Sequence, residues 1–228
     1  PKFKIVKPKK FEFTSELREA QVDMSRDIFD SFAETGYIHG IVQARPGTGK
    51  TVLGIYLAHK LNVVTLVVID NKKIVEQWVD EMIAHTDLER SDIGLIKGDK
   101  FDVEDKVIIV STPQTLSSKF KKHNKEFYPK FRDIGIGFII WDECHVIANE
   151  WGAGSLLFNT PNLIGMSATP WHGKDKEILM YSIFGEVVTK YGEYDFSPKY
   201  KMVEYKSGTG EKSGKRVNWL WENNFNMA

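Results

Sequence analysis

The sequence has a single cysteine, no long hydrophobic run and no excess of charge of either sign. Because Cys144 has no partner cysteine, an intramolecular disulfide is excluded, and we expect a reducing, cytoplasmic environment. No run of about 18 apolar residues occurs, so neither a membrane-spanning helix nor a membrane partner is expected. Lysine and arginine together number 31, as do aspartate and glutamate, so the net charge of zero argues neither for nor against a nucleic-acid partner.

Apolar runs and helically spaced apolar residues alternate along most of the chain, which has 228 residues and is 42% hydrophobic. This alternation predicts an α/β fold with a mainly parallel sheet and helices on both faces. Residues 119–130 are polar and rich in lysine, and we expect a loop or a partly helical insertion there. Strands are predicted at 37–42, 63–69, 93–97, 106–110, 137–141 and 162–166, and helices from Thr14 or Ser15 to Gly36 and at 52–61, 72–85 and 174–183.

The run Ala-Arg-Pro-Gly-Thr-Gly-Lys-Thr at 44–51 lies between a predicted strand and a predicted helix, the setting of a phosphate-binding loop. Small residues let several backbone N–H groups point at phosphate oxygens, and the helix N-terminus adds a partial positive charge. Lys50 can reach the β- and γ-phosphates, and Thr51 can place its hydroxyl on Mg²⁺. A Gly/Pro turn that ends in Lys-Thr by chance is the alternative. The predicted nucleotide contacts are Arg45, Pro46, Gly47, Thr48, Gly49, Lys50 and Thr51.

Two adjacent acids, Asp142 and Glu143, follow the apolar run at 138–141. Nucleotide sites in parallel α/β sheets lie at the carboxyl ends of the strands. Asp142 can therefore hold the Mg²⁺ that bridges the phosphates, and Glu143 can act as the general base that polarises the attacking water. Acids often simply end strands, but a pair downstream of a phosphate-binding loop predicts the second half of an ATP-hydrolysing site.

Further motifs occur in a fixed order along the chain, and together they resemble the first RecA-like motor domain of superfamily 2 helicases and translocases. The resemblance covers roughly residues 17–190 and is closest to the subgroup of XPB, RadD and phage UvsW-type enzymes. Two departures are Ala20, where an aromatic residue is usual, and Asp70, where proline is usual. The matching elements are the AxxGxGKT loop at 44–51, Asp-Glu-Cys-His at 142–145, Ser-Ala-Thr at 167–169, Leu-Arg-Glu-Ala-Gln at 17–21, Ile-Val-Glu-Gln-Trp at 74–78, and the segments 94–99 and 110–116.

The resemblance implies a RecA-like P-loop NTPase fold and a role for each matching residue. Lys50, Asp142 and Glu143 would be catalytic, and Thr51 and Asp142 would hold Mg²⁺. Gln21 would read the edge of adenine, although a glutamine on a helix surface is the alternative. Residues that would couple the ATP site to a partner lobe are His145, Ser167 and Thr169, and residues that would contact the nucleic-acid backbone are Thr112, Gln114 and Thr115.

The chain is expected to comprise three parts. Residues 1–13 form a basic, solvated N-terminal arm, residues 14–190 the RecA-like domain, and residues 191–228 a linker and the start of a second lobe. No QxxGRxGR element, the usual source of an arginine finger in the second lobe, occurs in the sequence. We therefore expect a fragment that binds ATP and Mg²⁺ but hydrolyses ATP slowly alone, since an arginine finger is worth roughly 10³–10⁵ in rate.

These observations predict the ATP-binding motor domain of a DNA helicase or translocase acting in repair or recombination. Its expected partners are ATP, the second RecA-like lobe of the same protein, and single-stranded, duplex or branched DNA. The alternatives are an RNA helicase, the motor subunit of a restriction enzyme, and a non-motor NTP-binding scaffold for nucleic acid. We expect a cytoplasmic or nucleoid-associated location, which would be the host cytoplasm for a phage-encoded protein.

Overall fold

The computed structural model describes residues 6–148, 160–170 and 174–192, and these residues form an α/β fold around an eight-stranded sheet. The strand order is β4-β3-β5-β2-β6-β7-β1-β8, and every pair is parallel except β3 with β4. The strands are β1 (His39–Ala44), β2 (Thr65–Ile69), β3 (Ile93–Lys97), β4 (Lys100–Phe101), β5 (Ile108–Ser111), β6 (Phe138–Asp142), β7 (Asn162–Ser167) and β8 (Val187–Tyr191).

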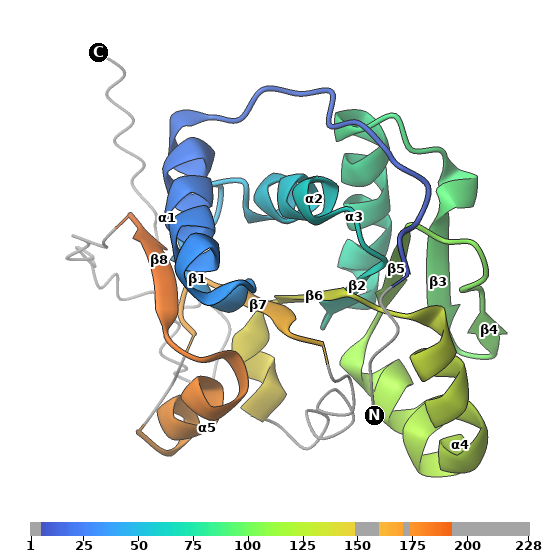
Figure 1. Cartoon of the computed structure of the whole chain (residues 1–228). Helices are drawn as coiled ribbons and strands as arrows, with labels where there is room; N and C mark the ends of the chain where they lie inside the picture. Colours follow the sequence, from blue (N-terminus) through green and yellow to red (C-terminus); the bar gives the residue numbers. More distant parts are fainter. Residues whose placement is uncertain (1–5, 149–159, 171–173, 193–228) are drawn as a thin grey trace, which may run out of the picture. The chain divides into compact units, whose positions relative to one another are not determined.

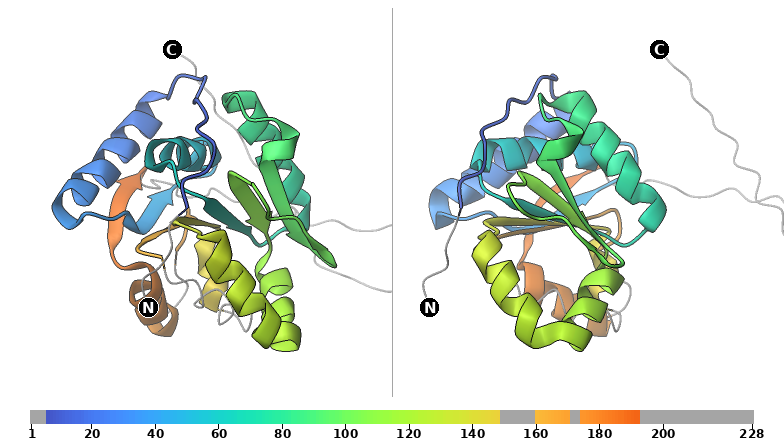
Figure 2. Two further views of the ribbon diagram at one scale, coloured as in Figure 1. Left: turned by 45° about the vertical axis from the view of Figure 1, so that its right-hand side comes forward. Right: turned by 90° about the vertical axis from the view of Figure 1, so that its right-hand side faces the viewer.

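Helices cover both faces of the sheet, as the sequence predicts. In Figure 1, α1, α2 and α3 lie above the sheet, and α4 and α5 lie below it; both views in Figure 2 keep this separation. The side chains of successive strand residues point to opposite faces of the sheet. Val67 therefore packs in the layer of α1–α3, and Val68 packs in the layer on the other face. The helices are α1 (Glu19–Thr35), α2 (Lys50–Leu61), α3 (Lys72–His85), α4 (Pro113–Ile134) and α5 (Lys174–Phe184), with short 3-10 turns η1 (Arg90–Asp92) and η2 (Cys144–Ala148).

Helix α1 begins later than the sequence predicts. Its N-cap is Arg18, and not Thr14 or Ser15, because Gln21 accepts the Arg18 backbone N–H at 2.8 Å and so satisfies the first turn. The expected end is confirmed, since Gly36 adopts a φ of 79° and donates its N–H back to the Phe32 carbonyl.

Three further elements differ from expectation. The polar segment 119–130, expected as a loop or a partly helical insertion, is helical throughout and belongs to the long helix α4. Thr112 caps the start of α4, because its hydroxyl oxygen accepts the N–H of Thr115 at 3.3 Å. Strands β4 and β8 were not predicted. Strand β8 is short and lies at the sheet edge, where Thr189 is buried, Val188 is partly exposed and Lys190 is exposed, so it lacks the apolar run of a central strand.

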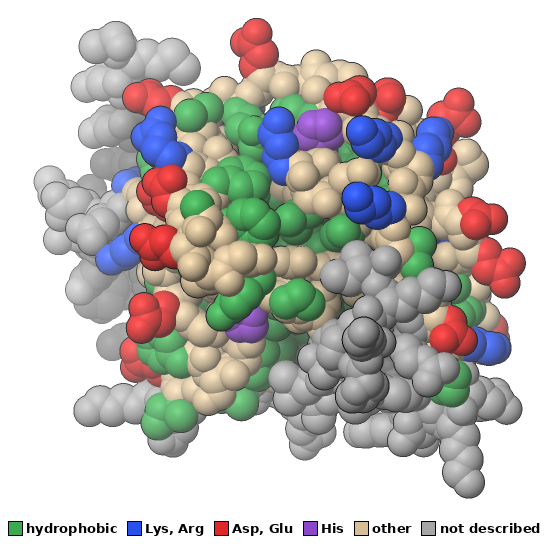
Figure 3. Space-filling view, viewed as in Figure 1, with side chains coloured by type: hydrophobic (Ala, Val, Ile, Leu, Met, Phe, Trp, Pro, Cys, Tyr) green, Lys and Arg blue, Asp and Glu red, His purple; other side chains and the backbone are tan. Residues whose placement is uncertain are grey.

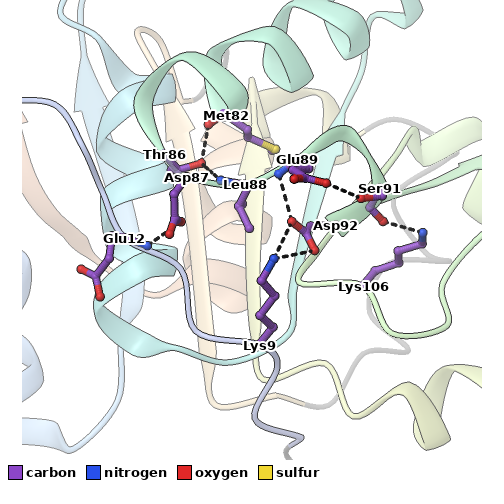
Figure 4. A network of polar contacts seen from close by, with 10 residues as sticks. All are labelled: Lys9, Glu12, Met82, Thr86, Asp87, Leu88, Glu89, Ser91, Asp92 and Lys106. Carbon is purple, nitrogen blue, oxygen red and sulfur yellow. Dashed lines mark hydrogen bonds and ion pairs between the residues drawn. The ribbon is translucent and has the colours of Figure 1, made fainter.

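The N-terminal segment of residues 6–15, here called the strap, is packed against the domain and is not the solvated arm expected from its lysines. Phe11 is 5% exposed, and its carbonyl oxygen accepts a hydrogen bond from His59 Nδ1 at 2.9 Å. Phe13 forms an isolated antiparallel bridge with Thr86. Figure 4 shows the strap joined to the segment after α3, where Lys9 Nζ donates to Asp92 at 3.1 Å and the Glu12 N–H to Asp87 at 2.7 Å.

The boundary expected after residue 190 stays a prediction, since residues 193–228 lie outside the described part; strand β8 itself continues to Tyr191. Among the described helices, none combines the length and hydrophobicity needed to cross a bilayer. On the face shown in Figure 3, acidic side chains lie mainly near the rim, and several basic side chains lie further in.

Candidate nucleotide-binding site

The phosphate-binding loop lies between the end of β1 and the start of α2, as predicted. Gly47 and Gly49 adopt φ angles of 82° and 79°, in the left-handed region that favours glycine. At Gly49 a Cβ would also lie 2.2 Å from Gln21 Nε2, so the Gln21 amide would have to move to make room for a side chain. Thr48 Oγ1 donates to the Arg45 carbonyl at 2.8 Å and closes the turn. The loop is therefore held in shape by its own bonds.

Gln21 connects the start of α1 to this loop. It is 2% exposed, which excludes the alternative of a surface glutamine. Its Oε1 accepts the Arg18 N–H, and its Nε2 donates to the Gly49 carbonyl at 3.0 Å. An amide has two N–H hydrogens and two lone pairs, so one donor and one acceptor of Gln21 are left for the edge of a base.

Lys50 is the first residue of α2 and turns back over the loop. Its Nζ donates to the carbonyl of Ala44 at 2.9 Å and to that of Arg45 at 3.3 Å. Neutral carbonyls satisfy the donors of an ammonium without balancing its charge. Phosphate oxygens, which carry charge, can therefore replace them favourably.

Asp142 lies at the end of β6 and is held from both sides. Trp78 Nε1 donates to its Oδ2 at 2.8 Å, and the Glu143 N–H donates to its Oδ1 at 3.1 Å. Burial raises the pKa of Asp142 above its ordinary value, and the Glu143 charge adds to this rise; the Trp78 N–H and the Lys50 ammonium oppose it. The orientation of this carboxylate is thus set by a side chain from α3.

The residues expected to couple the site to a partner lobe are brought together around Glu143. Strand β7 lies between β1 and β6, so Ser167 at its end is placed between the phosphate-binding loop and the acids. Ser167 Oγ donates to Glu143 Oε2 at 3.3 Å and accepts the Thr169 N–H at 3.2 Å. His145 Nδ1 is 3.0 Å from Ser167 Oγ and 3.3 Å from Glu143 Oε2. One hydroxyl therefore contacts the acid, the histidine and the following loop.

The loop and the two acids line one cleft of about 500 Å³. Thr51 and Asp142, the expected Mg²⁺ ligands, both belong to its lining. No cluster of three His, Cys, Asp or Glu side chains fit for a metal occurs in the described residues. This donor set nevertheless fits Mg²⁺, which commonly takes one or two protein oxygens and completes its shell with phosphates and water. The cleft is lined by Glu16, Arg18, Gln21, Gly47, Gly49, Lys50, Thr51, Val52, Gln77, Glu81, His85, Asp142 and Glu143.

The three residues expected to contact nucleic acid lie at the start of α4, outside this cleft. Thr112 Oγ1 donates to Thr115 Oγ1 at 2.9 Å, and Gln114 Nε2 donates to Asp70 Oδ1 at 2.8 Å. Thr112 is buried, whereas Gln114 and Thr115 are partly exposed. Their contact with nucleic acid stays a prediction.

Arg45, the loop residue that follows β1, contacts the residue after β8. Arg45 Nε donates to the Gly192 carbonyl at 2.8 Å, and Pro46 is exposed. Neither residue lines the cleft, so their predicted nucleotide contact stays a prediction.

Sequence reasoning missed the role of Trp78. Its large ring fits the pattern of a core residue, and it is indeed 1% exposed and packs against Gly54 of α2. The Gln-Trp pair at 77–78 was recognised as a motif in the sequence. The partner of the Trp78 indole N–H, Asp142 at the end of β6, is known only from the folded structure.

Several known proteins are similar to this chain. XPB of Mycobacterium tuberculosis, named as a DNA 3′–5′ helicase, is 26% identical over 72% of this chain and 29% of its own length. XPB2 of Sulfurisphaera tokodaii, named as a DNA 3′–5′ translocase, is 25% identical over 73% of this chain and 35% of its own length. Rad25 of Haloarcula marismortui is 27% identical over 75% of this chain and 26% of its own length. The chain thus spans about a quarter to a third of the length of these relatives.

Solved structures share the fold. The UvsW helicase from bacteriophage T4 superposes with a TM-score of 0.59 and 21% identity, over 82% of this chain and 63% of that one. The SWI2/SNF2 ATPase core of Sulfolobus solfataricus, solved with double-stranded DNA, gives a TM-score of 0.58 at 18% identity, over 79% and 38%. The family described as "Type III restriction enzyme, res subunit" matches residues 14–172. The chain therefore belongs to this family, and it is similar to the first RecA-like domain of superfamily 2 helicases of the XPB and UvsW kind.

Proposed function

We propose that this chain is the ATP-binding motor domain of a DNA helicase or translocase, which uses ATP hydrolysis to move on or remodel DNA in repair or recombination. The observation that carries the proposal is the single cleft in which the phosphate-binding loop faces Asp142 and Glu143. Relatives named as a DNA 3′–5′ helicase and a DNA 3′–5′ translocase support DNA as the track.

The loop, Lys50, Thr51, Asp142 and Glu143 each have a chemical task in this proposal. The loop N–H groups and Lys50 bind the phosphates, with Lys50 exchanging its two carbonyl partners for phosphate oxygens. Glu143 takes the proton of the attacking water, and the Ser167 hydroxyl fixes one of its carboxylate oxygens. Mg²⁺ held by Thr51 and Asp142 would neutralise charge on the phosphates.

We also propose that a second RecA-like lobe of the same protein completes the site. The matched part is 26% of one relative and 29% of another, which leaves room for such a lobe in proteins of this kind. Charge that develops on the γ-phosphate needs donors on more than one side, and the described cleft supplies the side of the loop. The 228-residue chain alone should therefore hydrolyse ATP slowly.

The test is ATP hydrolysis by the full-length protein with single-stranded DNA, duplex DNA, branched DNA and RNA. Stimulation by one or more DNA forms, lost in Glu143→Gln, supports a DNA motor. Stimulation by RNA alone would make the protein an RNA helicase. Nucleotide binding without hydrolysis under any of these conditions would favour a scaffold and overturn the proposal.

A further inference from the structure

Three polar side chains, Ser15, His85 and Glu81, connect the strap to α3 through hydrogen bonds. None of them has a role in the proposed ATP hydrolysis. Ser15 Oγ lies 2.7 Å from His85 Nδ1, and His85 Nε2 lies 3.0 Å from Glu81 Oε2. An ionised carboxylate can only accept, so the hydrogen between the latter two atoms lies on Nε2. In the neutral ring, Nδ1 then accepts from the Ser15 hydroxyl.

Two of these three side chains, Glu81 and His85, lie in the wall of the nucleotide cleft. Gln77, Glu81 and His85 all line it, and their spacing of four residues places them on one face of α3. Arg18 and Gln21 at the start of α1 line the same cleft. With the phosphates on the loop, the nucleoside therefore has lining residues of both α1 and α3 within the cleft.

Glu81 still has one free acceptor in this position. Its Oε2 is used by His85, whereas its Oε1 has no partner among the described residues. The groups of an adenine nucleotide that can donate to it are the exocyclic amine and the ribose hydroxyls. Gln21 retains a donor and an acceptor for the base edge, so the ribose is left for the carboxylate. Carboxylates bind ribose hydroxyls in the same way in dinucleotide-binding folds.

We infer that Glu81, held in place by His85 and Ser15, binds the ribose 2′-hydroxyl of a ribonucleoside triphosphate and makes this site select ATP over 2′-deoxy-ATP. The inference rests on the proposed nucleotide function of the cleft. Because the His85 bond already fixes the carboxylate, little side-chain entropy is lost on binding. A hydrogen bond to a partly exposed charged acceptor is worth about tenfold in affinity, and this sets the expected preference.

The experiment measures direct binding of ATP, 2′-deoxy-ATP and inosine triphosphate to the 228-residue chain by titration calorimetry. Wild type is compared with Glu81→Ala and with Glu76→Ala, a control on the same helix whose side chain is 58% exposed and lies outside the cleft. We expect Glu81→Ala to bind ATP and inosine triphosphate about tenfold more weakly and 2′-deoxy-ATP unchanged. The control should retain the wild-type preference.

Three results would overturn the inference. Equal affinity of wild type for ATP and 2′-deoxy-ATP would show that the ribose 2′-hydroxyl is not read. Weakening of ATP and 2′-deoxy-ATP but not of inosine triphosphate would assign Glu81 to the base. Equal weakening of all three nucleotides would give Glu81 no selectivity. In contrast, a wild-type chain that binds no nucleotide at all would refute the proposed function itself.

Discussion

Asp142 is the residue whose surroundings most clearly connect the fold to the chemistry. A carboxylate in a buried position loses solvation, which raises its pKa and disfavours the charged form that a metal needs. The Trp78 N–H and the Lys50 ammonium counteract this loss. The indole also fixes the orientation of the carboxylate, so α3 contributes to a site formed by the loop and β6.

Trp78→Phe should therefore raise the Mg²⁺ concentration needed for half-maximal ATP binding. Phenylalanine keeps most of the packing against Gly54 but removes the N–H that holds Asp142. The Trp78 N–H donates to a charged acceptor, so its loss should raise the Mg²⁺ concentration for half-maximal ATP binding about tenfold. The measurement is ATP binding at fixed nucleotide and increasing Mg²⁺.

Trp141→Phe is the matched control for this substitution. Trp141 precedes Asp142 on the same strand and is also buried, but its Nε1 has no hydrogen-bond partner in the described part of the chain. The control should leave the Mg²⁺ dependence as in wild type. If both variants shift it equally, general loosening of β6 is responsible and the Trp78 bond has no specific role.

The two adjacent acids should separate binding from turnover. In the full-length protein, Glu143→Gln keeps the shape of the side chain but cannot take a proton, so ATP should bind normally and turnover should fall by roughly 10²-fold or more. Asp142→Asn should instead weaken Mg²⁺-dependent binding. Single-turnover hydrolysis and equilibrium binding distinguish the two. Parental turnover in Glu143→Gln would exclude Glu143 as the base.

Single residues could be predicted where a motif fixes both residue type and position. Lys50, Thr51, Asp142 and Glu143 line one cleft as the sequence indicates. Trp78 could not be assigned in this way, because its bond to Asp142 joins residues 64 positions apart. An indole in a core pattern gives no sign of the atom to which its N–H will donate.

At the scale of elements, the strap is the main departure from the sequence-based expectation. Its lysines suggested a solvated arm, but Phe11 and Phe13 pack on the α2 and α3 side of the sheet. The lysines are exposed while the alternating aromatic residues face inward. The late start of α1 follows from the same contacts, since Thr14 donates its N–H to His85 and Ser15 contacts the ring of that residue.

Phe11→Ala should test whether the strap is part of the folded domain. Removing a buried phenyl ring costs about 3 kcal/mol, so the free energy of unfolding measured by urea titration should fall by that order. Lys7→Ala, an exposed position on the same strap, should change it little. A solvated arm would give no change in either variant.

Asp92 should make the anchoring of the strap depend on pH. The Glu89 backbone N–H, assisted by Lys9, holds the pKa of Asp92 below its ordinary value despite some desolvation. A lowered pKa contributes stability that is present above the ordinary value and is lost as the pH falls through the lowered one. Asp92→Asn should therefore reduce the free energy of unfolding at pH 7, and the reduction should shrink below about pH 4. A reduction of the same size at every pH would contradict this account.

At the scale of the whole described molecule, the order of the strands explains why distant motifs meet. The loop follows β1, the acids follow β6, and β7 lies between these strands with Ser167 at its end. The alternation of elements predicted a parallel sheet, but it could not give the crossovers, because pairs such as β2 with β6 and β1 with β7 are far apart in sequence. The family resemblance implied a RecA-like fold, and the strand order came from the structure.

The central claim is that this cleft binds ATP through the loop at 44–51, and a calorimetric titration of ATP with Mg²⁺ tests it most directly. Wild type should bind, and Lys50→Ala should bind at least about tenfold more weakly, because the ammonium that faces the phosphates is removed. Circular dichroism and the thermal midpoint should confirm that the variant is folded. Equal affinity of wild type and a folded Lys50→Ala variant, or no binding by wild type, would contradict the account.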